Sequence, residues 1–362
     1  TASIASRPCS NLSPEPAMRQ APPRIVLVTR QSRLRQLLSA WGTKGQVGFR
    51  YRSAKVASLA KQGKMDLAMA AQQVEEDADF MELDDEDAVY RESVSTLQRE
   101  LDLGMPVQVV DRSLVHTIDF SLCSCVVVAG PDGLVANTAK YACGIPIVGV
   151  NPDPGRIDGV LLPFRVHEAR NAVSRVLNQR AVIRTVTLAQ AQLDDGQRLL
   201  AFNDFFIGVA SHTSARYELA IESRDGRRSE AQISSGVLVS TGAGSTGWMS
   251  SVFNMAIGLT QAMGSSGAAP ALRAETLPWE ARELLWAVRE PFRSQASGVE
   301  LVAGKLREGE RMTLESQMSS GGVIFSDGME QDFRRFDGGA IVDIGIAPES
   351  AKLVVQHAAA ST

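Results

Sequence analysis

Short, uninterrupted apolar runs mark the first half of the chain. They occupy Ile25–Val28, Val126–Ala129 and Ile145–Val150, and parallel strands covered on both faces have this pattern. Helical spacing of apolar residues follows the first run at Leu34–Leu38 and recurs at Tyr90–Leu101. Alternating strands and helices predict an α/β domain with a parallel, Rossmann-like sheet.

The pattern changes at about residue 180, where short β-rich runs separated by turn residues take over. This pattern of short strands predicts a mainly β second domain. One helix-like stretch interrupts it after Gly247. The expected strands are Val182–Leu188, Leu199–Gly208, Tyr217–Ile221, Gly236–Ser240, Glu300–Val302, Met312–Glu315 and Ile341–Ile346.

A chain of 362 residues is longer than a single hydrophobic core usually supports, so two domains are expected. Residues 1–23 are rich in Ser, Pro and Ala and are predicted to be an unstructured, flexible leader; the remnant of a targeting peptide is the alternative. The predicted divisions are a leader at 1–23, an α/β nucleotide-binding domain at 24–170, a β-rich dinucleotide-binding domain at 171–350 and a C-terminal tail at 351–362.

Two segments are predicted to be exposed loops. Residues 75–87 carry nine acids and no base, after a helix expected at 54–74. We interpret this acidic run as a solvated, mobile loop, with a metal or partner site as the alternative. Met263–Pro270 is rich in small residues and is predicted to be a linker.

Composition and charge narrow the class of protein. Hydrophobic residues make up 44% and charged residues 22%, and the formal net charge is -4 with a pI of about 5.7. These values favour a water-soluble protein that binds no nucleic acid, because phosphate neutralisation needs an excess of Lys and Arg. No run approaches the ~20 apolar residues of a membrane helix, so no membrane contact is expected.

Four cysteines occur, and their spacing suits no disulfide framework. Cys9, Cys123, Cys125 and Cys143 are scattered, which favours a reducing compartment: the cytoplasm, or alternatively a mitochondrial or other organellar matrix. Cys123 and Cys125 alternate on one side of an apolar run and are expected to be small core residues. No set of metal-ligating residues is predicted.

The segment Gly130-Pro131-Asp132-Gly133 is a candidate phosphate-binding turn. It connects the strand that ends at Ala129 to a helix-like stretch at Leu134–Tyr141, and ligands of such βαβ units bind at the carboxyl ends of the strands. Glycines let backbone N–H groups approach phosphate oxygens. A carboxylate in the turn can accept the proton of a hydroxyl that attacks a phosphoryl group. An ordinary structural turn is the alternative.

Two polar segments of the second half are candidate contacts for a nucleotide. Ser240–Trp248 is dense in hydroxyls and glycines, and Trp248 is able to stack on a base. Asn203 and Asp204 lie at the end of a predicted strand, where an amide and a carboxylate can form hydrogen bonds with the two hydroxyls of a ribose. The structural alternatives are a loop that caps the following helix and an ordinary turn.

The order of these segments resembles the NAD kinase family. The family signatures are a GGDG loop, a GIN segment, an Asn-Glu pair and a loop written TPTGSTAY. Asn151–Arg156 and Val288–Pro291 are similar to a divergent branch that includes mitochondrial NAD kinases and uncharacterised bacterial relatives. The resemblance covers residues 24–350, and the matching segments are Gly130–Gly133, Gly149–Asn151, Asn203-Asp204 and Ser240–Trp248.

The resemblance implies a two-domain NAD kinase-like fold that binds NAD and ATP between its domains. Family members transfer the γ-phosphate of ATP to the 2′-hydroxyl of the adenosine ribose of NAD, with a divalent metal such as Mg²⁺, and are usually homo-oligomers. Asp132 matches the residue that positions or deprotonates the hydroxyl, and Gly130 and Gly133 match phosphate-loop glycines. The implied dinucleotide contacts are Asn151, Asn203, Asp204, Thr241, Gly244, Ser245, Thr246 and Trp248.

Two departures from the family pattern keep other functions open. Pro131 replaces the second glycine of the loop and removes one N–H donor. Asp204 replaces Glu, which shortens the side chain by ~1.5 Å. One alternative is a weak or inactive NAD(H)- or ATP-binding relative that acts as a sensor or assembly subunit. Another is a kinase for a different hydroxyl compound.

Overall fold

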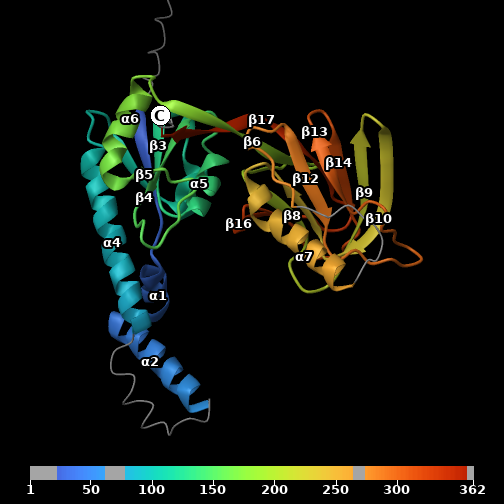
Figure 1. The fold of residues 1–362 in the computed structure, drawn as a ribbon, viewed down its shortest axis with the longest axis horizontal. Coiled ribbons are helices and arrows are strands. Elements are labelled where there is room, and N and C mark those ends of the chain that lie inside the picture. Colours follow the sequence, from blue (N-terminus) through green and yellow to red (C-terminus); the bar gives the residue numbers. More distant parts are fainter. Residues whose placement is uncertain (1–22, 62–77, 264–273, 357–362) are drawn as a thin grey trace, which may run out of the picture.

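The computed structural model describes residues 23–61, 78–263 and 274–356. It has an α/β half and a β-rich half, and strands β6 and β17 run between them (Figure 1). The leader predicted at 1–23 and the linker predicted at Met263–Pro270 fall almost wholly outside the described residues.

The α/β half is built on parallel strands in the order β2-β1-β3-β4, with β5 paired to β4. Side chains of β1 alternate between two cores: Ile25 and Leu27 pack on one face, and Val26 and Val28 on the other. All four are fully buried, as expected of strands covered on both faces. The strands are β1 (Arg24–Thr29), β2 (Val107–Asp111), β3 (Cys123–Ala129), β4 (Pro146–Asn151) and β5 (Phe164–Arg165).

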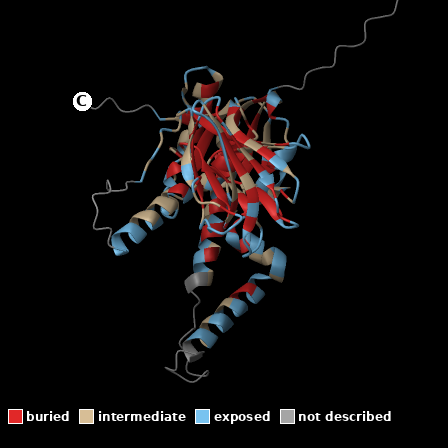
Figure 2. Cartoon of the chain, turned by 90° about the vertical axis from the view of Figure 1, so that its right-hand side faces the viewer, coloured by how far each residue is buried: buried red, intermediate tan, exposed pale blue. Residues whose placement is uncertain are grey.

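Helices cover both faces of this sheet. Helix α5 lies on the side of the β-rich half, and α4 and α6 lie on the opposite side, while α1 and α2 extend downward as an arm whose residues are largely exposed (Figures 1 and 2). The helices are α1 (Arg33–Trp41), α2 (Lys44–Lys61), α4 (Ala78–Glu100), α5 (Asp132–Ala139), α6 (Ala169–Leu177) and α7 (Trp248–Ala262), with short 3-10 turns η1 (Arg112–Thr117), η2 (Phe120–Leu122), η3 (Val166–Glu168) and η4 (Gly244–Thr246).

The acidic run 75–87 is not the predicted loop over its described part. Residues 78–87 form the first half of α4, and two of its acids are buried. Glu86 accepts hydrogen bonds from Arg30 at 3.0 Å and Arg33 at 2.7 Å. Burial alone would raise the pKa of Glu86, but these two guanidinium groups hold it below its usual value. The prediction failed because the paired arginines, Arg30 and Arg33, come from the passage from β1 into α1, more than 50 residues away in sequence.

The β-rich half consists of two antiparallel layers around one core. Strands β10-β9-β14-β17 extend the large sheet, and β17 joins it to β4 through Lys352 opposite Pro146. The second sheet has the order β13-β12-β11-β8-β15-β16. The strands are β6 (Val182–Leu193), β7 (Arg198–Ala201), β8 (Asp204–Val209), β9 (Ala215–Ser223), β10 (Gly226–Ser234), β11 (Val237–Ser240), β12 (Glu283–Val288), β13 (Ala303–Arg307), β14 (Arg311–Ser316), β15 (Gly322–Ser326), β16 (Met329–Arg335) and β17 (Ile341–Val355).

The predicted class, an α/β half followed by a β-rich half, is confirmed, and several boundaries differ. The strand expected at Leu199–Gly208 is broken at Phe202-Asn203 into β7 and β8. Glu300–Val302 is not a strand, and β13 begins just after it. Residues 351–355, assigned to a tail, continue β17 within the sheet.

The two strand cysteines are core residues, as predicted. They do not share a side, because the register between β1 and β3 shifts between Cys123 and Cys125. Cys123 therefore packs in one core and Cys125 in the other. Burial raises the pKa of the Cys125 thiol to about 12, so it stays protonated at neutral pH.

Candidate functional site

The Gly130–Gly133 turn lies at the carboxyl end of β3, where α5 begins. A Cβ at Gly130 would lie 2.7 Å from Cδ2 of Leu134, so a larger residue there would make the Leu134 side chain move. Pro131 precedes the first helical residue, and its carbonyl accepts the N–H of Leu134 at 2.8 Å. Asp132 is the first residue of α5, and one carboxylate oxygen accepts the N–H of Leu161 at 2.6 Å.

A loop after β4 supplies that N–H group, and Asn151 shapes the loop. The Asn151 amide donates to the carbonyl of Ile157 at 2.8 Å and accepts the N–H of Asp153 at 3.0 Å. Gly149 allows the loop to cross β4, because a Cβ there would lie 2.0 Å from the Leu161 carbonyl oxygen. The Asn151 side chain thus folds the loop that holds Asp132, and its hydrogen bonds are made within the loop.

In the β-rich half, the Ser240–Trp248 segment packs directly on the break between β7 and β8. The N–H of Thr241 donates to the carbonyl of Asn203 at 2.9 Å, and its hydroxyl donates to that of Phe202 at 2.5 Å. A Cβ at Gly244 would lie 2.1 Å from the Asn203 carbonyl oxygen, so this contact requires glycine. The structure brings these predicted segments together as one unit.

The hydroxyl side chains of this loop have different roles. Thr241 and Ser245 are fully buried, and Ser245 donates to the Gly242 carbonyl at 2.7 Å and accepts the N–H of Leu277 at 3.1 Å. Both hydroxyls therefore build the loop. Thr246 and Trp248 are exposed, and only these two predicted residues of the loop present their side chains to solvent.

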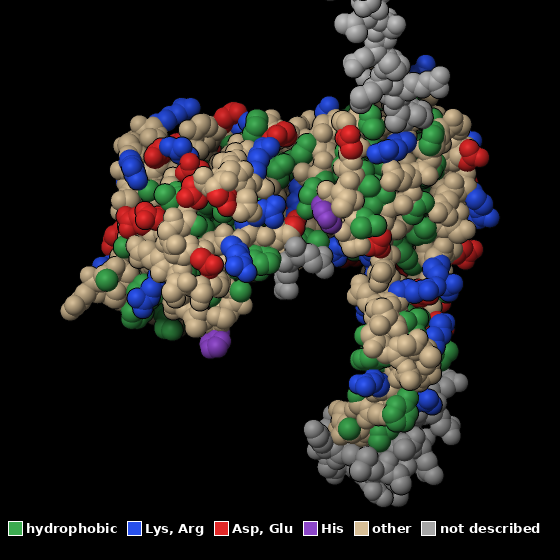
Figure 3. Space-filling view, turned by 180° about the vertical axis from the view of Figure 1, so that it is seen from behind, with side chains coloured by type: hydrophobic (Ala, Val, Ile, Leu, Met, Phe, Trp, Pro, Cys, Tyr) green, Lys and Arg blue, Asp and Glu red, His purple; other side chains and the backbone are tan. Residues whose placement is uncertain are grey.

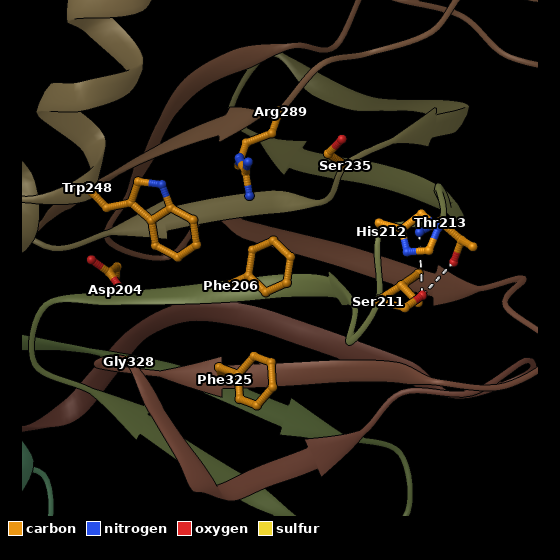
Figure 4. Close-up of a pocket in the computed structure, with 11 residues that line it drawn as sticks. Asp204, Phe206, Ser211, His212, Thr213, Ser235, Trp248, Arg289, Phe325 and Gly328 are labelled. Atoms are coloured by element: carbon orange, nitrogen blue, oxygen red, sulfur yellow. Dashed lines mark hydrogen bonds between the residues drawn. The ribbon is translucent and has the colours of Figure 1, made fainter. Parts of the chain in front are cut away.

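Aromatic side chains form the floor of a cavity of about 550 Å³ beside this loop. The rings of Trp248 and Phe206 stack with centroids 5.6 Å apart, and Phe206 stacks on Phe325 at 6.3 Å. The Arg289 guanidinium lies 5.2 Å from the Trp248 ring and 5.8 Å from the Phe206 ring, as Figure 4 shows. We call this the aromatic cavity; Asp204 and Gly328 also line it.

Asp204 brings a perturbed carboxyl group into the aromatic cavity. Burial and the nearby Asp327 raise its pKa to about 7. Asp327 is half-buried and accepts the backbone N–H of Asn203 at 2.6 Å and of Phe202 at 3.1 Å. Asp204 is thus poised to exchange a proton, or to accept a hydroxyl hydrogen bond, near neutral pH.

A hairpin tip connects the aromatic cavity to a second cavity. Asp327 and Gly328 form the two-residue turn between β15 and β16, with φ of 54° and 65°, as an Asp-Gly turn of type I′ requires. Gly328 lines both the aromatic cavity and a neighbouring cavity of about 610 Å³. The latter lies where β1, β2 and β3 end, and we call it the strand-end cavity; its lining includes Arg30, Gln31, Asp111, Arg112 and Pro131.

Sequence reasoning missed several residues of these cavities. No sequence motif gave a binding role to Phe206 on β8, to Phe325 on β15 or to Arg289, which directly follows β12. The Asp327-Gly328 pair, between the apolar Val323–Phe325 and Met329, did carry a hairpin signal. Arg30 and Arg112 each follow the end of a parallel strand, which is where ligand contacts are expected in such sheets.

The surface and the titratable groups add three findings. Basic and acidic side chains are interspersed over the face drawn in Figure 3. No helix in the described ranges is long and apolar enough to cross a membrane. Within the same ranges, no group of three or more His, Cys, Asp or Glu residues is placed to hold a metal ion.

Comparison with known proteins gives structural likenesses and no sequence match. No protein-family model and no curated protein matches the chain. The crystal structure of yeast NADH kinase complexed with NADH superposes with a TM-score of 0.51 at 16% identity, over 93% of this chain and 84% of that chain. The chain therefore has an NAD kinase-like fold.

Proposed function

We propose that this protein is an NAD kinase-like phosphotransferase that moves the γ-phosphate of ATP to the 2′-hydroxyl of the adenosine ribose of NAD. One observation carries the proposal. An aromatic cavity suited to a nucleoside and a cationic cavity at the strand ends meet at Gly328, and the strand-end cavity reaches the Gly130–Gly133 turn at Pro131.

The aromatic cavity suits the acceptor. A base can stack on Trp248 or Phe206, since every base has a π-face. Arg289 lies over the same rings and can pair with a pyrophosphate group. The Asp204 carboxyl, which lines the cavity, can accept hydrogen bonds from ribose hydroxyls.

The strand-end cavity suits the phosphates of the donor. Arg30 and Arg112 line it, and in the described part of the chain the Arg112 guanidinium forms no ion pair, contacting instead the sulfur of Met329. Mg²⁺ in kinases is held largely by substrate phosphates with one or two carboxylates, so it needs no cluster of protein ligands. Asp111 is the carboxylate that lines this cavity.

We infer that Asp132 is the proton acceptor. Its contact with Leu161 fixes the carboxylate at the start of α5. Asp132 does not line the strand-end cavity itself, but the preceding residue, Pro131, does. In the reaction, the 2′-oxygen forms a bond to the γ-phosphorus, the bond to the ADP oxygen breaks, and the hydroxyl proton passes to Asp132. The free carboxylate oxygen of Asp132 is the atom that would receive it.

The structural likeness supports the choice of substrate. The similar yeast protein is named an NADH kinase and its structure contains NADH, which supports a nicotinamide dinucleotide as the acceptor here. Self-association and a location in the cytoplasm or an organellar matrix stay predictions from the sequence.

The direct test is formation of NADP. Purified full-length protein with Mg-ATP and NAD should give NADP and ADP in equal amounts, measured by chromatography. NADH as acceptor and inorganic polyphosphate as donor belong in the same experiment. Thermal stabilisation by nucleotides with no phosphorylated product under any of these pairings would contradict the proposal.

A further inference from the structure

A third cavity lies along the seam between the two halves of the molecule. It has a volume of about 410 Å³ and is enclosed by η1, α5 and β16. We call it the seam cavity. It shares Arg112, Ser113 and Met329 with the strand-end cavity, so the two adjoin. No residue of the segments that match the NAD kinase signatures lines it, but its lining includes four residues of the helix-like stretch that follows the Gly130–Gly133 turn: Leu134, Asn137, Thr138 and Tyr141.

Three residues that line the seam cavity carry buried polar atoms without partners. Asn137 is 6% exposed, and its amide oxygen has no hydrogen-bond partner in the described part of the chain. The same holds for one carboxylate oxygen of Asp332 and for Nε of Arg334. An unpaired buried polar atom costs about 1–3 kcal/mol, so three of them directly behind the wall of one cavity favour a polar ligand there.

The rest of the local structure is firmly bonded, which makes these three atoms exceptional. Lys140 is buried and bridges the halves, with its ammonium 2.7 Å from the Asp332 carboxylate and 2.6 Å from the Ser326 hydroxyl. The Tyr141 hydroxyl donates to the same Asp332 oxygen at 2.5 Å. The cavity walls are therefore held in place, with one Asp332 oxygen left over.

The lining fits a nucleobase better than a bare anion. Val115, Leu134 and Met329 are buried apolar walls, and a planar base can pack between such groups. An Asn side chain matches the amino and ring-nitrogen edge of adenine with two hydrogen bonds. A volume of 410 Å³ falls in the range of small-ligand sites, about 300–1,000 Å³.

We propose that the seam cavity binds the adenine base of the phosphoryl donor, with Asn137 reading its edge and the phosphates extending past Arg112 into the strand-end cavity. That this nucleotide is the phosphoryl donor rests on the function proposed above. The binding of an adenine nucleotide at the seam cavity does not depend on that function. The three cavities then form one path, with the donor base at the seam, its phosphates at the strand ends and the acceptor on the aromatic floor.

The test measures ADP binding by titration calorimetry on the full chain, without turnover. His116→Trp places a bulky ring at the exposed rim of the cavity, and Leu114→Trp is the matched control because Leu114 is 54% exposed on the same turn and does not line the cavity. His116→Trp should weaken ADP binding at least tenfold, and Leu114→Trp by less than twofold. NAD binding should be unchanged in both.

A second variant separates the base from the phosphates. Asn137→Ala should weaken ADP binding about tenfold, the loss expected for one or two hydrogen bonds, and leave binding of inorganic tripolyphosphate unchanged. Equal losses for the two ligands would show an anion site and overturn the assignment of the base. Circular dichroism melting confirms that the variant is folded; if it is not, His116→Trp alone decides.

The two proposals can fail separately. If ADP binds and His116→Trp weakens it while no NADP is formed, the seam site stands and the kinase function falls. If NADP is formed but His116→Trp leaves the affinity for ADP unchanged, or if only Trp248→Ala abolishes ADP binding, the seam site is overturned. Absence of any ADP binding also overturns it.

Discussion

Asp204 is buried and Asp327 is half-buried, and their carboxyl groups lie close enough to repel each other. Burial raises the pKa of Asp327 as well, but Lys140 and the backbone N–H groups of Phe202 and Asn203 favour its charged form. Across the described ranges no hydrogen bond reaches the Asp204 carboxyl. Asp204 therefore lacks partners that would stabilise its charge, and with a pKa of about 7 it is partly protonated at neutral pH inside the aromatic cavity.

This relationship predicts how stability depends on pH. The pKa of Asp204 is about 7 in the folded protein against 3.8 for an unperturbed aspartate, so the folded state binds more protons between these values. Its contribution to stability must fall as pH rises from about 4 to about 7 and stay constant above. Asp204→Asn removes the charge and should increase the free energy of unfolding at pH 8, with a ceiling of ~4 kcal/mol.

Urea unfolding at several pH values between 4 and 8 measures this effect. The difference between Asp204→Asn and wild type should grow with pH over that window. Asp225→Asn, in the exposed turn between β9 and β10, serves as the control and should follow the wild-type curve. A variant less stable than wild type at pH 8 would show that Asp204 is paired and charged in the folded protein.

The elements that the sequence predicts well are those buried on both faces. β1, β3 and β4 are continuous apolar runs because each lies in the middle of a covered sheet. Edge strands carry no such signal. β10 begins with four exposed residues, Gly226–Ser229, and only its backbone bonds to β9 define it as a strand.

The motifs of the site could be predicted from the sequence. Which of their side chains face a cavity, and how the cavities meet, could not. Thr241, Ser245 and Asn151 look like ligand contacts in the sequence, yet their side chains bond to backbone groups of the protein itself. Whether a hydroxyl faces inward or outward depends on neighbours far away in the chain. The meeting of two cavities at Gly328 likewise depends on the packing of one half against the other.

Asp132→Asn should abolish turnover without unfolding the chain. The amide oxygen of Asn can still accept the N–H of Leu161, so the loop after β4 stays attached to α5. Loss of the proton acceptor should lower kcat by about 10²-fold or more, with the melting temperature unchanged. Asp158→Asn, an exposed acid on the same loop, is the control; a comparable loss of kcat there would exclude a specific role for Asp132.

Pro131→Ala tests the cost of the missing N–H group in the phosphate turn. Pro131 has φ of -72° and ψ of 166°, which any residue adopts, so the backbone need not move. The restored N–H adds one donor to the turn and should lower the KM for ATP about tenfold, the gain for a hydrogen bond to a charged group. Stability should fall by ~1 kcal/mol or less from added chain entropy. An unchanged KM would place the phosphates away from this turn.

Trp248→Ala tests whether the aromatic cavity holds the base of the dinucleotide. The ring stacks on Phe206 and lies under Arg289, and it is 39% exposed, so its removal should cost little stability. Base stacking on an aromatic ring contributes ~1–3 kcal/mol, so the Kd for NAD should rise by about 5- to 150-fold, measured by calorimetry. Trp248→Phe keeps a stacking surface and should restore most of the affinity.

The same Trp248→Ala variant tests whether donor and acceptor bind separately. Trp248 lines neither the seam cavity nor the strand-end cavity, so ADP binding should be unaffected. A loss of ADP affinity equal to that of NAD would mean that both nucleotides compete for the aromatic floor, and the separation of donor from acceptor would be wrong.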